Sequence, residues 1–132
     1  MEITTTQEQD RVPVTVLHLK GELDAVFADQ LRQKGREAIA SGTRYLLLDL
    51  AAVPYIASAG LRAFQEIFTS LREGSVDEGD KDIHQGLRDG TYKSPNLKLL
   101  NPTRHALEAL SAAGFDMFLE IHHNLRDAVA SF

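Results

Sequence analysis

Hydrophobic and polar residues alternate in the first part of the chain and recur with a helical period further on. In the β-branched run Val12–Leu19, the valines at 12, 14 and 16 alternate with other residues, a pattern typical of a strand, and we expect Ile3–Gln7 to form a short first strand. Apolar residues then recur at spacings of three and four after Gly21–Asp24, and again over Leu61–Leu71. This spacing lays one apolar stripe along each of two amphipathic helices.

Two shorter runs are apolar without interruption. Tyr45–Leu48, which is closed by Asp49, and Leu97–Leu100 are each typical of a strand that is covered on both faces. Asn101 and Pro102 follow the second run directly. We interpret them as the N-cap and the first residue of another helix, because proline is favoured at the first helical position.

Toward the C-terminus, the pattern predicts a short strand over Phe118–Ile121 and a last short helix around Leu125–Val129. Strands that alternate with helices pair in parallel through right-handed crossovers. We therefore predict an α/β fold for residues 1–132, a single domain with a small, mixed but mostly parallel sheet of four to five strands and about four helices. The 43% of residues that are hydrophobic suffice for one core.

This topology predicts where a site would lie. Asp24, Ser58 and Asn101 each follow a predicted strand, so we expect them to meet at the carboxyl edge of the sheet, where such folds place binding sites. Ser58 stands directly before the apolar stripe of its helix, where the first backbone N–H groups lack intrahelical acceptors. A phosphate there would meet open donors and the positive end of the helix dipole. The alternative is that Ser58 is only an N-cap, a role in which serine is common.

The segment Tyr55–Leu61, together with Gly21–Asp24 upstream, resembles the signature of the STAS family, the anti-sigma-factor antagonists of bacteria. The resemblance implies a small α/β fold without catalytic activity or cofactor. It also implies partner switching, in which the chain binds an anti-sigma factor that is at the same time a serine kinase. A phosphatase and weak self-association are further expectations.

Carried over by motif, Ser58 is the expected phosphoacceptor and Asp24 the acidic neighbour at the kinase-binding edge. The partner-binding surface is expected to include Ala59, Gly60 and Arg62 as well. Family members commonly have an acidic residue directly before the serine, where this chain has Ala57. That difference keeps a second interpretation open, a STAS scaffold or sensor module that is not phosphorylated and works within a larger signalling complex.

Charge and composition exclude several other functions. The chain has a net charge of -5 and lacks the clustered basic residues of a nucleic-acid-binding surface. It has no cysteine, which excludes disulfides and thiolate chemistry. The five histidines are scattered, and the adjacent pair His122-His123 would point apart, so we expect no metal site. The chain shows neither a spanning apolar run nor a signal peptide, which predicts a cytoplasmic protein without a membrane partner.

One segment departs from the alternation of strands and helices. Residues 74–95 hold four glycines and mixed charges with few apolar side chains. We interpret this segment as a flexible insertion into the domain, because long loops of such composition are often disordered. A second docking surface is the alternative.

Overall fold

The computed structural model describes residues 1–74 and 93–132. Most of the predicted insertion at 74–95 lies outside these residues, so its flexibility stays a prediction. The elements follow one another along the chain as β1 (Glu2–Gln9), β2 (Pro13–Lys20), α1 (Ala25–Ala40), β3 (Leu46–Ala52), α2 (Ser58–Gly74), β4 (Leu97–Leu100), α4 (Arg104–Ala112), the 3-10 helix η1 (Phe115–Met117), β5 (Glu120–His122) and α5 (Leu125–Ala130).

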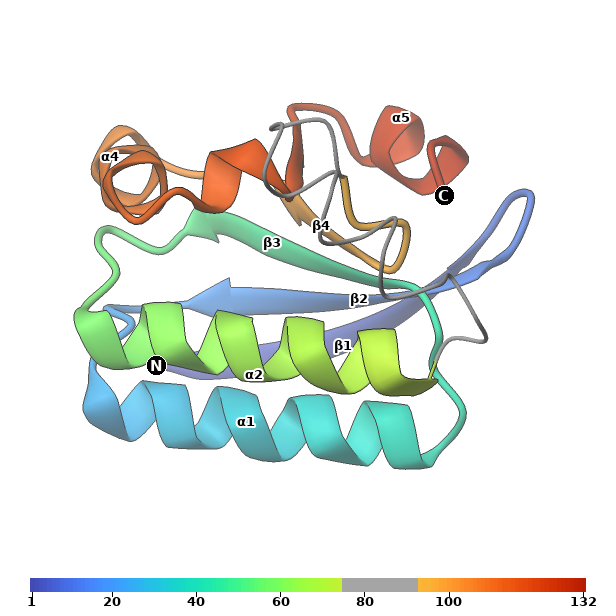
Figure 1. The fold of residues 1–132 in the computed structure, drawn as a ribbon, viewed down its shortest axis with the longest axis horizontal. Helices are drawn as coiled ribbons and strands as arrows, with labels where there is room; N and C mark the ends of the chain where they lie inside the picture. Colours follow the sequence, from blue (N-terminus) through green and yellow to red (C-terminus); the bar gives the residue numbers. More distant parts are fainter. Residues whose placement is uncertain (75–92) are drawn as a thin grey trace.

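The strands form one five-stranded sheet in the order β1-β2-β3-β4-β5. β1 pairs antiparallel with β2, with Glu2 opposite Lys20 and Gln9 opposite Pro13, whereas the other neighbours pair in parallel. α1 and α2 lie side by side along the sheet, and α4 and α5 lie on the other side of the molecule (Figure 1). The mixed, mostly parallel sheet and the α/β class predicted from the sequence are therefore confirmed.

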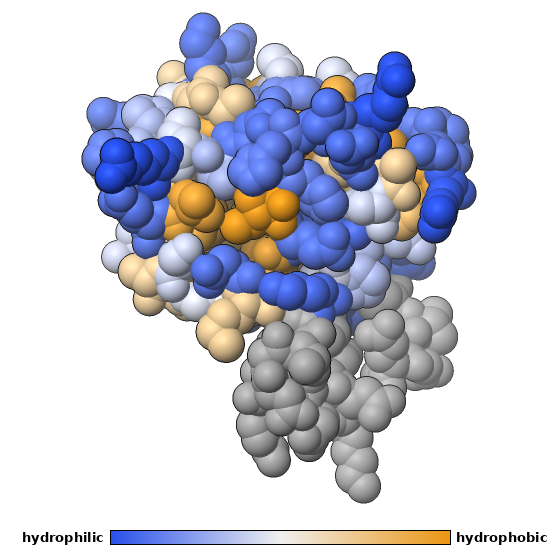
Figure 2. All heavy atoms as spheres, turned by 90° about the horizontal axis from the view of Figure 1, so that it is seen from above, coloured by the Kyte–Doolittle hydropathy of each residue, from blue (hydrophilic) through white to orange (hydrophobic). Residues whose placement is uncertain are grey.

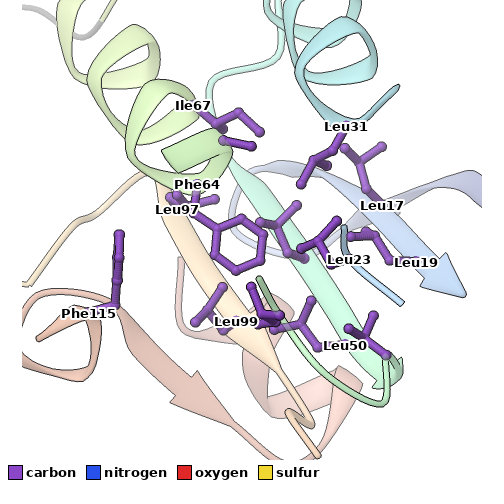
Figure 3. Close-up of a cluster of buried hydrophobic side chains, with 14 of the residues drawn as sticks. Leu17, Leu19, Leu23, Leu31, Leu50, Phe64, Ile67, Leu97, Leu99 and Phe115 are labelled. Carbon is purple, nitrogen blue, oxygen red and sulfur yellow. The ribbon is translucent and has the colours of Figure 1, made fainter. Parts of the chain in front are cut away.

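Strand alternation divides the buried side chains into two clusters. The larger one joins the sheet to α1, α2 and α4, and it contains Leu50 and Leu99 from the strands together with Leu31 and Phe64 from the helices (Figure 3). The helical stripe predicted for α2 supplies this cluster, since its phenylalanines and Leu71 are buried. The smaller cluster joins the opposite face to α5. Each strand residue thus packs on the face that its place in the alternation dictates.

The turn into α4 differs from the prediction. Asn101 is not an N-cap, because its backbone is left-handed with φ 51° and its N–H donates to the carbonyl of His122 at 2.8 Å. Thr103 takes the cap instead, with Oγ1 accepting from the N–H of Ala106 at 3.3 Å. Asn101 turns the chain before the helix can begin, so the helix starts at Arg104 rather than at Pro102. β5 also begins later than predicted, at Glu120, because the N–H groups of Phe118 and Leu119 both donate to the carbonyl of Phe115 and close the turn after η1.

A buried lysine links the sheet to the C-terminal residues, which the sequence pattern did not reveal. The side chain of Lys98 is 4% exposed, and its Nζ lies 3.2 Å from Oε2 of Glu120. The same ammonium donates to the carbonyl and the hydroxyl of Ser131 at 2.9 and 3.0 Å, and it lies 4.8 Å from the ring centroid of Phe132. These contacts give a buried charge the partners that it needs.

Seen from above, the side of the molecule that carries α4 and α5 is mainly hydrophilic around a small apolar patch (Figure 2). No helix within residues 1–74 and 93–132 is both long enough and apolar enough to span a membrane.

Candidate functional site

The segments that leave β2 and β3 run side by side at the carboxyl end of the sheet. Leu23 and Ile56 form an isolated parallel bridge, in which the N–H of Leu23 donates to the carbonyl of Tyr55 at 3.1 Å and the N–H of Ala57 donates to the carbonyl of Leu23 at 3.0 Å. Leu23 and Ile56 are both buried. Their immediate neighbours therefore face away from the core, and the bridge brings the first residues of α1 and α2 together (Figure 1).

Gly60 allows this close approach. A Cβ atom at this position would lie 2.7 Å from Cγ of Leu23 and 2.9 Å from Cγ2 of Ile56, closer than side-chain atoms pack. Gly60 is itself buried, so its first role is to let the opening turn of α2 rest on the bridge. Its predicted contact with a partner stays a prediction.

Asp24 is the N-cap of α1. Its backbone is extended, and Oδ1 accepts from the N–H of Phe27 at 2.9 Å. The residue is partly exposed, and within the described part of the chain Oδ2 has no hydrogen-bond partner. Asp24 thus has a structural function as a cap and also presents a carboxylate oxygen at the surface.

Ser58 is the first residue of α2 and is exposed. The position before the helix belongs to Ala57, whose carbonyl accepts from the N–H groups of Gly60 and Leu61 at 2.9 and 3.1 Å. In residues 1–74 and 93–132, no acceptor meets the N–H of Ser58 or Ala59, and the Ser58 hydroxyl has no hydrogen-bond partner. The simple capping role that was the alternative for Ser58 is therefore wrong, because its hydroxyl caps no backbone N–H.

The electrostatics at this point favour an anion. The first turn of α2 contains no acidic residue, so the helix has no side chain of its own there that would oppose the positive end of its dipole. Arg62 is exposed one helical turn after Ser58, at the spacing where side chains on a helix meet. Ala59 is partly buried and packs against the larger core cluster. A free hydroxyl thus stands beside open donors and a cation.

Thr103, in the segment that follows β4, is bonded to the loop between β3 and α2. Its hydroxyl donates to the carbonyl of Val53 at 2.7 Å while it caps α4. Sequence reasoning assigned this place to Asn101 and missed Thr103. The signal was present, because threonine is a favoured N-cap and stands directly before the helical pattern.

Comparison with known proteins places these residues in a family. The model of the STAS domain matches residues 4–77, a range that covers β1 to α2 and both segments of the bridge. The chain belongs to the STAS domain family.

Relatives of this STAS domain include an anti-sigma-F factor antagonist of Mycobacterium tuberculosis, RsfB. The two are 30% identical over 96 residues, which span 67% of this chain and 79% of RsfB. Among solved structures, an anti-sigma factor antagonist from Mycobacterium paratuberculosis has a TM-score of 0.68 at 21% identity, covering 98% of this chain and 93% of its own. The structure of SpoIIAA in its unphosphorylated form also has a TM-score of 0.68, at 17% identity, and the match covers 96% of this chain and 93% of SpoIIAA. The likeness to the solved structures confirms the predicted STAS fold, and the relationship to RsfB confirms the predicted anti-sigma-factor antagonist family.

In the described residues, no group of three or more acidic or histidine side chains is placed to hold a metal ion. The arrangement can present a hydroxyl, a carboxylate and a helix N-terminus to another protein.

Proposed function

We propose that this STAS domain is a cytoplasmic anti-sigma-factor antagonist that acts by partner switching and is controlled by phosphorylation of Ser58. The observation that carries the proposal is the position of Ser58, which is exposed at the first residue of α2, while the Leu23–Ile56 bridge joins its segment to the one that contains Asp24. The antagonist family of its relatives supports an anti-sigma factor as the partner.

The switch works through charge. Without phosphate, the edge around Asp24, Ser58 and Arg62 docks on the anti-sigma factor, which releases sigma. The anti-sigma factor is also the kinase and brings ATP and Mg²⁺, so this chain supplies only the hydroxyl. A phosphate adds about -1.5 to -2 charges inside the interface, where its desolvation and its repulsion by nearby acids weaken binding. A phosphatase restores the unmodified form.

The first test is phosphorylation by a purified anti-sigma factor kinase. Each such kinase encoded by the source genome is incubated with the chain and ATP, and the product is mapped by mass spectrometry. Ser70 is a matched control, because it is exposed in the same helix and far from its start. We expect wild type and Ser70→Ala to be modified and Ser58→Ala to remain unmodified. Modification at Ser70 or Thr43 instead would contradict the assignment.

The second test separates binding from modification. Ser58→Asp is expected to weaken binding to the same anti-sigma factor by at least about tenfold, or 1.4 kcal/mol, whereas Ser58→Ala should bind like wild type. A chain that binds the anti-sigma factor but is modified at no residue would instead support the scaffold interpretation.

The third test asks whether Asp24 acts as a charge or as a cap. Asp24→Ser keeps a favoured N-cap residue and removes the carboxylate, whereas Asp24→Ala removes both. We expect both variants to lose affinity equally, and only Asp24→Ala to lose stability, by about 1 kcal/mol. If Asp24→Ser binds like wild type, the carboxylate does not belong to the interface.

A further inference from the structure

Exposed apolar side chains flank the candidate site. The described part of the chain exposes five large hydrophobic residues, namely Met1, Val26, Tyr55, Met117 and Leu125. Val26 is 58% exposed and stands two positions after Asp24, and Tyr55 is 40% exposed and stands three positions before Ser58. Burial of such side chains in a contact with another molecule is favourable.

The fold holds both side chains rather than leaving them on loose loops. The carbonyl of Tyr55 accepts from Leu23 within the bridge, and Tyr55 precedes the buried Ile56, so its side chain faces away from the core. Val26 lies in the first turn of α1, which Asp24 caps, directly before the buried Phe27. Side chains fixed in this way lose little conformational entropy when a partner covers them.

We infer that Val26 and Tyr55 are the apolar anchors by which this chain binds its anti-sigma factor, an inference that rests on the proposed function. The partner must then present an apolar pocket at the centre of the interface, with polar groups at the rim facing Asp24 and Arg62. The apolar contact also explains the sensitivity to phosphate. When a phosphorylated Ser58 is placed beside this apolar contact, the phosphate loses its hydrating water, and this desolvation weakens binding of the phosphorylated form.

Matched variants test the anchors. Val26→Ser and Tyr55→Ser remove the apolar surface at the site, whereas Met117→Ser and Leu125→Ser remove comparable exposed surface in η1 and α5. Tyr55→Phe keeps the ring. Affinity is measured by calorimetry with the anti-sigma factor kinase that binds the wild-type chain, and thermal melting checks that every variant folds.

We expect each anchor variant to raise Kd by at least about tenfold, and the two remote variants and Tyr55→Phe to change it by less than about twofold. The loss of affinity caused by each anchor variant should be similar at about 0.05 and 0.5 M salt, because an apolar contact is not screened. Equal affinity of all the serine variants would overturn the inference and leave the proposed function intact. Loss only with Met117→Ser or Leu125→Ser would also overturn it and move the interface to the side of α4 and α5. Failure of the wild-type chain to bind any such kinase would overturn both.

Discussion

Substitution of Gly60 by alanine tests the packing that joins the two segments of the site. Alanine would bring its Cβ to 2.7 Å from Cγ of Leu23 and 2.9 Å from Cγ2 of Ile56. Cγ of Leu23 is a branch point and Cγ2 of Ile56 is a methyl group bound directly to Cβ, so both lie close to the backbone of buried residues and neither can move aside as the end of a long side chain would. Such overpacking costs about 1–3 kcal/mol, and the better helix propensity of alanine returns up to about 1 kcal/mol. We expect a net loss of about 1–2 kcal/mol in the free energy of unfolding.

Chemical denaturation and thermal melting measure this loss, and each 1 kcal/mol should lower Tm by about 4 °C in a domain of this size. Gly35→Ala is the matched control, since its Cβ would meet only Cγ1 and Cδ1 of Ile67, at 3.0 and 3.1 Å. These contacts are longer than those at Gly60, so Ile67 has to give way by only a few tenths of an ångström and the control should change stability by less than about 1 kcal/mol. If Gly60→Ala is as stable as wild type, or less affected than Gly35→Ala, the bridge does not depend on the glycine and our account of the site geometry is wrong.

Three further substitutions test other contacts. Lys98→Ala should destabilise the chain by about 2–4 kcal/mol in urea denaturation, because it removes the ammonium that binds Ser131 and Glu120. Glu120→Gln should cost less than about 1 kcal/mol, because the Glu120 side chain is partly exposed. Thr103→Val should cost about 1–2 kcal/mol by the same measurement, because the cap of α4 and the bond to Val53 are both lost. Ser58→Asp should raise the free energy of unfolding by about 0.5–1 kcal/mol, because a first-turn carboxylate interacts favourably with an otherwise uncompensated helix end, and an unchanged or lower value would contradict that electrostatic picture.

The fold could be predicted from the sequence wherever side-chain periodicity decides the structure. The β-branched run over Val12–Leu19 became β2, whose two faces contribute to the two buried clusters. The three-and-four spacing over Leu61–Leu71 became α2, because burial of one helical face fixes that period. Asn101 was wrongly predicted to be an N-cap, because its left-handed backbone accompanies a hydrogen bond from its N–H to the carbonyl of His122 in β5, far along the sequence. No local pattern contains that contact.

The position of the candidate site could be predicted from the sequence, but the packing that joins its two segments could not. Parallel topology placed Asp24 and Ser58 at one edge, and the structure brings their segments together. The pairing of Leu23 with Ile56 and the need for Gly60 arise from three-dimensional packing between segments more than thirty residues apart. The partners of Lys98 likewise come from β5 and the C-terminus, so its burial could not be inferred from Leu97–Leu100 alone.

The outer edge of β1 has a consequence for aggregation. β1 is the first strand of the sheet, and an unpaired strand edge invites a second copy to pair with it. An antiparallel pair of two such strands centred on Thr5 would set Glu2 of each copy opposite Glu8 of the other, so two pairs of like charges would face each other. The strand therefore carries its own protection against edge-to-edge growth at neutral pH. Neutralisation of both glutamates, by acid or by substitution with glutamine, should expose this edge to fibril-like association.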